Sequence, residues 1–323
     1  MASLVVLAGS VVRMTGSGMG CPDWPKCFGL AIPPTSVEEV TWTLGARYSP
    51  GRMLLSNDTL WVAQSAVLAE DFGLERSKGI WEAYTRHDYA VFNPMHTWVE
   101  FINRLIGALT GVPALLLALG TFILGWRQKK WRPFGWALAN LLLLGLVAWM
   151  GKKVVDGNLI PFSITLHMLG AVAILLVLTA AWMSLATPLQ GLGLKRRNWL
   201  VIALVITGVQ LVAGTQVREQ IDFLSHSGLM REDWLDALPE WWKWHRTGSW
   251  MILGIQFFWA WPNRRRFPAA RYAMALVLLQ MVTGILFVFA NMPGWAQPLH
   301  LALAMALLVS NGWVLMRAGR RQS

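Results

Sequence analysis

Residues 264–290 read RRRFPAARYAMALVLLQMVTGILFVFA, a run of arginines followed by a long apolar segment, and this pattern decides the fold. A helix needs about 20 mostly apolar residues to cross a bilayer. The chain contains seven such segments, at 97–125, 133–151, 160–187, 198–216, 241–261, 269–290 and 294–316. The sequence therefore predicts an all-α integral membrane protein.

The overall composition supports this prediction. Of the 323 residues, 55% are hydrophobic and only 14% are charged, whereas a soluble domain carries about 25% charged residues. This balance excludes a disordered nucleic-acid-binding protein and argues against a soluble enzyme. The net charge of +11 would suggest an anionic partner in a soluble protein, but here it reflects membrane topology. We expect contacts with membrane lipid and no nucleic acid partner.

An eighth apolar segment lies at residues 2–12 and is too short to span a membrane alone. A signal peptide would need a basic start and a cleavage site. We therefore expect the outer half of a first helix that is truncated at its N-terminus. Eight transmembrane helices follow.

Basic residues determine the expected orientation. Fourteen basic residues and no acidic one fall in four segments, at 126–133, 195–197, 264–271 and 317–321. All 17 acidic residues and the other 14 basic ones lie on or near the opposite side. Because positive loops face the cytoplasm, we expect both termini to be cytoplasmic. The large outer loop then runs from 17 to 94, and its residues 57–72 are expected to form a surface helix or a partly ordered loop.

The two halves of the chain resemble each other. AGSVVR at 8–13 recurs as AGTQVR at 213–218, Asn103-Arg104 aligns with His245-Arg246, and His167 aligns with His300. Four spans separate the copies, so the repeats have the same orientation. The sequence predicts two pseudo-symmetric four-helix bundles, residues 1–193 and 194–323.

The paired histidines indicate a ligand site. His245 and His300 lie at matched depth on two helices of one bundle, where two imidazoles can bind a haem iron axially. Each of the four aligned positions is followed, one helical turn later, by a small residue that would leave clearance for a porphyrin: Gly107, Ala171, Ser249 and Ala304. The alternatives are interfacial histidines and ordinary helix packing.

Charged residues adjoin these positions. Arg104 and Arg246 directly follow the aligned pair, and Arg13 and Arg218 end the first and fifth spans. These arginines either bind haem propionates or extend to the membrane surface. Glu100 lies one turn before Asn103 and either pairs with Arg104 or accepts a proton beside a reactive group.

Taken together, these residues resemble the haem A synthase family. The resemblance rests on VRMTGSG at 12–18 running into CPDWPKC at 21–27, on EFINR at 100–104, and on the histidines at 167, 245 and 300. It covers essentially the whole chain apart from the missing start. The run from RMTGSG to CPDWPKC is specific, whereas the separate histidines are not.

The resemblance implies a function. In the family, the second half holds haem b between the histidines that match His245 and His300, and the first half binds haem O. The C8 methyl group of haem O is oxidised to a formyl group, which gives haem A for cytochrome oxidase. The catalytic carboxylate matches Glu100. The paired outer-loop cysteines match Cys21 and Cys27, which we expect either to form a disulfide or to remain as thiols.

One position departs from the family. Many members have histidine where this chain has Asn103, and asparagine is a poor iron ligand. Either His167 holds the substrate iron alone and Asn103 holds water, or His96 replaces the missing histidine.

The alternative function is a quinol-linked dihaem b electron-transfer protein of the membrane. We expect a multi-pass protein of a prokaryotic inner membrane. The expected partners are a haem O synthase, an electron donor and a second copy of the chain.

Overall fold

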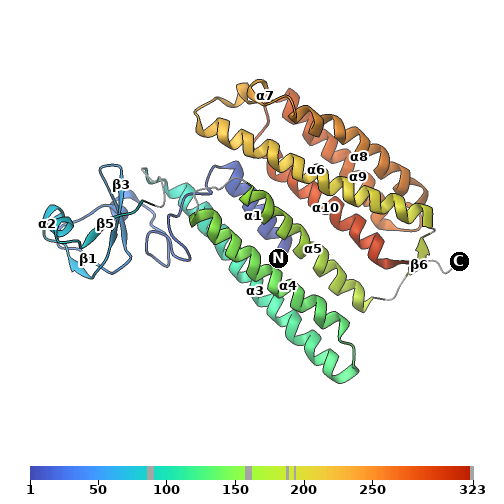
Figure 1. The fold of residues 1–323 in the computed structure, drawn as a ribbon, viewed down its shortest axis with the longest axis horizontal. Helices are drawn as coiled ribbons and strands as arrows, with labels where there is room; N and C mark the ends of the chain where they lie inside the picture. The colour runs from blue at the N-terminus through green and yellow to red at the C-terminus, as the bar shows by residue number, and fades with distance from the viewer. Residues whose placement is uncertain (86–90, 157–161, 187–188, 193, 321–323) are drawn as a thin grey trace. The chain divides into compact units, whose positions relative to one another are not determined.

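The computed structural model describes residues 1–85, 91–156, 162–186, 189–192 and 194–320 (Figure 1). Most of them are helical. Part of the predicted outer loop (86–90), both ends of the span predicted at 160–187 and the predicted bundle boundary at 193 lie outside the described residues.

The predicted apolar segments are helices. They lie in α3 (Pro94–Gln128), α4 (Arg132–Asp156), α5 (Ser163–Leu185), α6 (Leu194–His226), α8 (Trp242–Asn263), α9 (Pro268–Phe289) and α10 (Ala296–Arg317). Within the described part of the chain, six helices are long and apolar enough to cross a membrane, and α8 is not among them. Its first turns contain Lys243, His245 and Arg246, which lower its hydropathy. The chain is thus a multi-pass membrane protein, whereas α1 (Ala2–Met14) is too short for this class and the count of eight spans stays a prediction.

The chain divides into two compact units, which we describe separately. The helical unit comprises Met1–Ser10, Leu109–Val147 and Ile164–Ser323, and the sheet unit comprises Val11–Ala108 and Ala148–Ser163. Short elements in the helical unit are η2 (Arg231–Asp233), α7 (Trp234–Ala237), β6 (Leu189–Leu192) and β7 (Ala318–Arg320), the last two paired in parallel.

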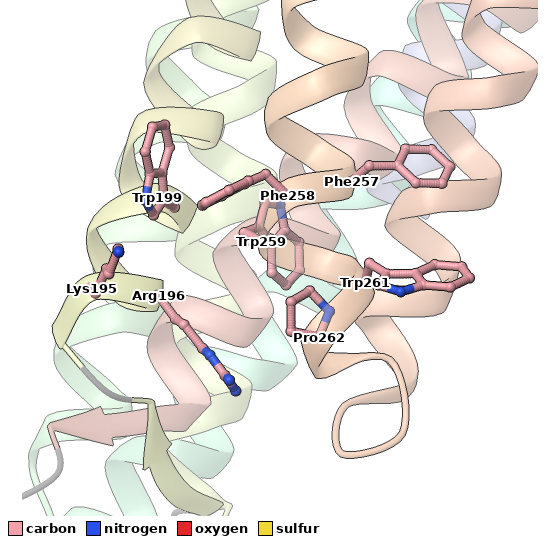
Figure 2. Close-up of a pocket in the computed structure, with 8 residues that line it drawn as sticks. All are labelled: Lys195, Arg196, Trp199, Phe257, Phe258, Trp259, Trp261 and Pro262. Carbon is pink, nitrogen blue, oxygen red and sulfur yellow. The ribbon is translucent and has the colours of Figure 1, made fainter.

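Four helices pack around the main core of the helical unit. Helix α6 packs against α8 and α10, and α9 packs against the same two helices. Leu200, Ile252, Val277 and Leu307 contribute one buried apolar side chain from each helix. Trp259, drawn in Figure 2, is the largest fully buried side chain of the described residues and belongs to the same cluster. Alanines at 203, 260, 270 and 273 allow the backbones to approach closely.

The sheet unit is built on a small antiparallel sheet. Strands β2 (Met53–Ser56), β3 (Thr59–Ala63) and β5 (Trp81–Ala83) form it, β1 (Arg47–Tyr48) pairs with β4 (Val67–Leu68), and η1 (Val37–Val40) and α2 (Phe72–Ser77) flank these strands. The sheet separates two buried clusters. Met53 and Leu60 belong to a cluster that includes both cysteines, whereas Leu54 belongs to a cluster with Trp81. Because side chains alternate along a strand, successive residues of β2 and β3 pack into the two clusters on opposite faces of the sheet.

The prediction of a surface helix at 57–72 is wrong, because this stretch contains strands β3 and β4. Ser56 pairs with Thr59 in a hairpin, and the two residues between them, Asn57 and Asp58, have φ of 49° and 54°. Asparagine and aspartate favour this two-residue turn, which resembles a helix cap in sequence. The following run at 60–63 is apolar throughout because both faces of β3 are buried, and such a run does not reveal its period.

Candidate functional site

His245 on α8 and His300 on α10 face each other in the helical unit. Their ring centroids are 6.5 Å apart. A metal–imidazole bond is about 2 Å long and the bonding nitrogen lies about 1 Å from the ring centre, so two imidazoles on opposite sides of one metal ion have centroids about 6 Å apart. The spacing of the two rings therefore matches a pair of axial ligands.

The hydrogen bonds of Thr283 orient the ring of His300. Thr283 Oγ1 lies 2.6 Å from His300 Nδ1 and also lies 2.9 Å from the carbonyl oxygen of Gln280. When the hydroxyl donates its one hydrogen to this carbonyl, its oxygen can accept from Nδ1–H. The lone pair of Nε2 is then free to bind a metal ion, the usual arrangement for a ligating histidine.

Two residues of α6 fit the region around His245. Gln210 donates its side-chain amide to the carbonyl oxygen of His245. A Cβ at Gly214 would come within 2.9 Å of His245 Cε1, so this position admits only glycine without a shift of the ring. Nδ1 of His245 is buried and has no hydrogen-bond partner among the described residues, which leaves the ring available for a ligand.

These features fit a haem. The histidine pair would supply two ligands, since haem iron takes imidazole as a ligand. Arg218 donates to Gln297 Oε1 at 2.7 Å and pairs with Asp222 at 2.7 Å, so it joins α6 to the first turn of α10. Arg246 is exposed and its guanidinium lies 5.1 Å from the centre of the Trp242 ring. The contribution of either arginine to propionate binding stays a prediction.

Three residues around the histidine pair were not predicted from the sequence. Gln210 and Thr283 are polar residues within apolar spans, which is the feature that could have marked them. Gly214 belongs to the repeated AGTQVR segment, but its steric role follows only from the packing of α6 on α8. Gly214 leaves room for the imidazole of His245, and the clearance for a porphyrin one turn after each aligned position stays a prediction.

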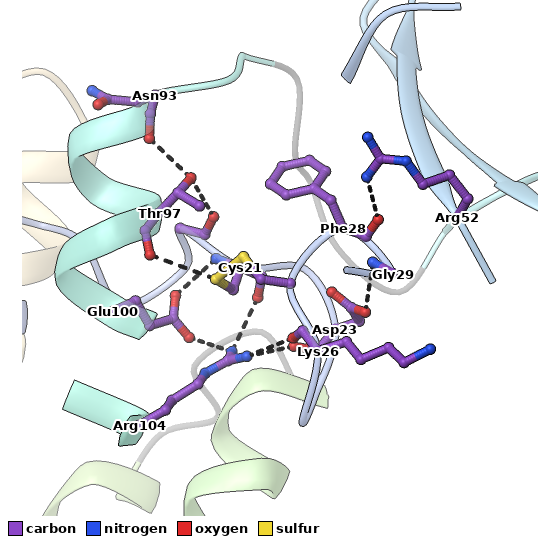
Figure 3. Close-up of a disulfide and its surroundings, with 12 residues drawn as sticks. Cys21, Asp23, Lys26, Phe28, Gly29, Arg52, Asn93, Thr97, Glu100 and Arg104 are labelled. Atoms are coloured by element: carbon purple, nitrogen blue, oxygen red, sulfur yellow. Dashed lines mark hydrogen bonds and ion pairs between the residues drawn. A yellow bond between two sulfur atoms is a disulfide. The ribbon is translucent and has the colours of Figure 1, made fainter. Parts of the chain in front are cut away.

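Glu100 lies in the sheet unit and is only 4% exposed. One of its carboxylate oxygens accepts the backbone N–H of Cys21 at 2.9 Å, and the other pairs with Arg104 (Figure 3). Arg104 also donates to the carbonyl oxygens of Asp23 at 2.6 Å, Lys26 at 3.0 Å and Cys21 at 3.2 Å. The ion pair therefore fastens the cysteine-containing loop to α3.

The loop itself is closed by a disulfide between Cys21 and Cys27, which confirms the pairing expected from the resemblance. Thr97 on α3 donates its hydroxyl to the carbonyl oxygen of Gly20 at 2.9 Å. A Cβ at Gly20 would overlap the backbone at His96, so a glycine is required where the loop meets the helix. Burial raises the pKa of Asp23, although the Gly29 N–H, 3.0 Å from its carboxylate, opposes this rise.

The residues predicted for the substrate site fall in both units. His167 belongs to the helical unit, whereas Asn103, His96 and Arg13 belong to the sheet unit. His167 Nδ1 and Asn103 Oδ1 are buried and lack hydrogen-bond partners among the described residues. This pattern is compatible with ligand contacts, but the site formed by these residues stays a prediction.

Within the helical unit, hydrogen bonds connect the helix of His167 to α6. Thr165 Oγ1 lies 2.9 Å from Thr215 Oγ1 and accepts the Gln216 amide at 2.8 Å. Thr215 directly follows Gly214. The two histidine-bearing regions of this unit are therefore joined through one turn of α6.

The sequence of the chain matches a known protein family. The sequence model of the COX15-CtaA family, described as cytochrome oxidase assembly protein, matches residues 1–48 and 81–311. The intervening residues 49–80 contain β2, β3, β4 and α2.

Several relatives carry the name heme A synthase. The protein from Methylobacterium radiotolerans is 26% identical over 94% of this chain and 83% of its own length. The protein from Beijerinckia indica is 26% identical over 94% and 86%, and that from Paramagnetospirillum magneticum is 26% identical over 99% and 91%. No solved structure matches the chain. Because the family match covers most of the sequence, the chain belongs to the COX15-CtaA family of cytochrome oxidase assembly proteins.

Proposed function

We propose that the protein is a haem A synthase, an oxidoreductase that converts the C8 methyl group of haem O to a formyl group and supplies haem A to terminal oxidases. The observation that carries the proposal is the His245–His300 pair with its 6.5 Å spacing. This pair occurs in a member of a cytochrome oxidase assembly family whose relatives carry the name heme A synthase.

The helical unit would hold haem b through His245 and His300. A bound haem b supplies one-electron transfer. The protein's part is to fix the two imidazoles. Thr283 orients His300, Gln210 binds the backbone at His245, and Gly214 leaves room for its ring.

On the substrate side, His167 would bind the iron of haem O, with Asn103 holding water or His96 serving as a second ligand. Arg13, Arg104, Arg218 and Arg246 are the candidates for binding propionates. Arg104 is the least available of these for a propionate, because the loop carbonyls and Glu100 engage its donors.

Glu100 is the proposed proton acceptor. Oxidation of a methyl group to a formyl group adds one oxygen atom from O2 or water, removes electrons that an oxidant must take up, and releases protons that a carboxylate near the reacting carbon can accept. A carboxylate has about four lone-pair sites, and Cys21 and Arg104 engage Glu100 through one bond to each oxygen. Glu100 can therefore hold the loop and still accept a proton.

The proposed location is the inner membrane of a prokaryote, with both termini in the cytoplasm. The fourteen basic residues gathered in three connections and the C-terminal segment support this orientation. An electron donor, a haem O synthase and a second copy of the chain are the proposed partners.

Co-expression with a haem O-producing enzyme tests the function. Pigments are extracted and separated by reversed-phase chromatography, and haem A is expected with the wild-type chain. The variant Glu100→Gln should still accept the Cys21 N–H and retain haem, but should yield no haem A. Retention of haem O or haem B without conversion by the wild-type chain would contradict the proposal and favour dihaem electron transfer.

A further inference from the structure

A pocket of about 320 Å³ lies between α6 and α8, away from the histidine pair. Figure 2 shows Lys195 and Arg196 on the first turn of α6 and Trp261 and Pro262 on the last turns of α8. The remaining lining is aromatic, with Trp199, Phe257, Phe258 and Trp259. Two cations therefore border a cavity whose walls are apolar.

Hydrogen bonds fix the floor of this pocket. Arg196 lies 3.4 Å from Asn263 Oδ1, and the Asn263 amide donates to the Trp259 carbonyl at 2.6 Å. The Trp259 indole then donates to Gln256 Oε1 at 2.7 Å. Asn263, Trp259 and Gln256 are almost fully buried, so the inner side of the pocket rests on the packed core of the helical unit.

The walls are suited to hydrocarbon. The rings of Trp199 and Phe258 are 4.7 Å apart, and Phe258 and Trp261 remain 56% and 54% exposed. Tryptophan favours the interface between the hydrocarbon core and the headgroups. A pocket at the end of membrane helices can therefore receive the glycerol and upper acyl region of a lipid.

The charges around the pocket are unbalanced. No acidic residue occurs between 157 and 218 or after Glu240, while Lys195, Arg196 and the arginines at 264–266 gather where α6 begins and α8 ends. Cations at the start of a helix oppose the helix dipole. An external anion would relieve this repulsion and would also meet the free N–H groups of the first turn.

We propose that this pocket binds an anionic phospholipid, with its phosphate held by Lys195 and Arg196 and its acyl chains against Trp199 and Phe258. Basic pockets between transmembrane helices recognise anionic headgroups in this way. A free inorganic phosphate would use the cations but not the aromatic walls, so the apolar lining favours the lipid.

Native mass spectrometry of the full chain tests this assignment. The protein is equilibrated with equal amounts of phosphatidylglycerol and phosphatidylcholine that have identical acyl chains. The wild type should retain phosphatidylglycerol preferentially. Lys195→Gln/Arg196→Gln should lower the preference about 30-fold, because each basic residue near the surface contributes about 1 kcal/mol.

The matched control is Arg265→Gln/Arg271→Gln, which removes the same charge from exposed residues that do not line the pocket. This control should keep the preference. Equal loss in both double variants would assign the effect to net charge and overturn the proposal. Displacement of the lipid by millimolar inorganic phosphate would overturn it too, because the site would then be a simple anion site.

Discussion

The helical unit and the sheet unit hold their functional side chains in different ways. In the helical unit, His300 depends on one side-chain hydrogen bond, from its ring to Thr283, and the His245 backbone carbonyl depends on one, from Gln210. In the sheet unit, Arg104 alone makes four contacts, with three loop carbonyls and Glu100. A disulfide then closes the same loop.

This difference separates two consequences of mutation. Loss of a single bond in the helical unit leaves the apolar core at Trp259 and Leu307 intact, so ligand binding should change more than folding. Loss of one contact partner in the sheet unit leaves a buried charge behind, so folding should change more. The following variants test that distinction.

The largest expected effect is that of His300→Ala, which removes one of the two proposed axial ligands. We expect the variant to lose haem b completely, because a single imidazole is left to hold the iron. Haem content per chain and the absorption spectrum of the purified protein measure this. His96→Ala is the matched control, since His96 lies in the sheet unit, and it should keep haem b. Unchanged haem in the His300 variant would refute the ligand assignment.

The next effect concerns the buried ion pair. Arg104→Gln leaves Glu100 without its cation, and removal of one partner of a buried pair costs about 3–5 kcal/mol. Thermal unfolding should occur at a lower temperature, and backbone hydrogen exchange at residues 20–27 should be faster. Glu100→Gln/Arg104→Gln should recover part of the loss, because no buried charge remains.

An exposed ion pair provides the control for this variant. Lys243 pairs with Glu240 at 2.5 Å, with side chains 43% and 85% exposed. Lys243→Gln should change stability by less than about 1 kcal/mol. If the Arg104 and Lys243 variants were equally stable, the loop would not depend on the buried pair.

The helices could be predicted from the sequence, because an apolar run of about 20 residues is typical of a membrane-spanning helix. The match in depth between His245 and His300 also identified a pair that the structure brings together. Thr283 and Gln210 could have been marked as polar residues within apolar spans, but their partners, and the role of Gly214, depend on the rotation of α9 and α6 about their axes. The sequence gives the depth of a residue in a span more readily than the neighbour it faces.

The sheet unit was less predictable for a different reason. Its strand at 59–63 is buried on both faces, so Leu60 and Trp61 appear as a continuous apolar run. The disulfide came from the resemblance of the cysteine motif, not from local periodicity. Glu75 gave no sequence signal either, since its partners Trp42 and Trp81 approach it only in the folded chain.

A smaller effect is expected from Thr283→Val, which removes the acceptor of His300 Nδ1–H but keeps the side-chain shape. The fold should persist, whereas haem affinity should fall about 10–100-fold, the usual effect of losing a partner of a metal-binding histidine. Haem titration and the reduction potential of the bound haem measure this. Thr283→Ser restores the acceptor and should behave like the wild type. Equal affinities in the two variants would remove Thr283 from the site.

The smallest effect concerns Glu75 and pH. Burial alone would raise the pKa of Glu75. Hydrogen bonds from the Glu70 N–H at 2.8 Å and from the indoles of Trp81 and Trp42 lower it by more, so the pKa lies below the ordinary value of 4.5. A pKa lower in the folded than in the unfolded state stabilises the protein above the unfolded value, and this stability is lost as the pH falls through the folded value.

Glu75→Gln should therefore lower the unfolding temperature by a few degrees at pH 6, and the difference from wild type should shrink as the pH falls below about 4. Thermal unfolding of the full chain, followed by tryptophan fluorescence, measures both values. Glu82→Gln is the control, because Glu82 is exposed on β5, and it should leave the pH dependence unchanged. A constant difference between wild type and Glu75→Gln at all pH values would mean that shape, rather than the charge of Glu75, stabilises the sheet unit.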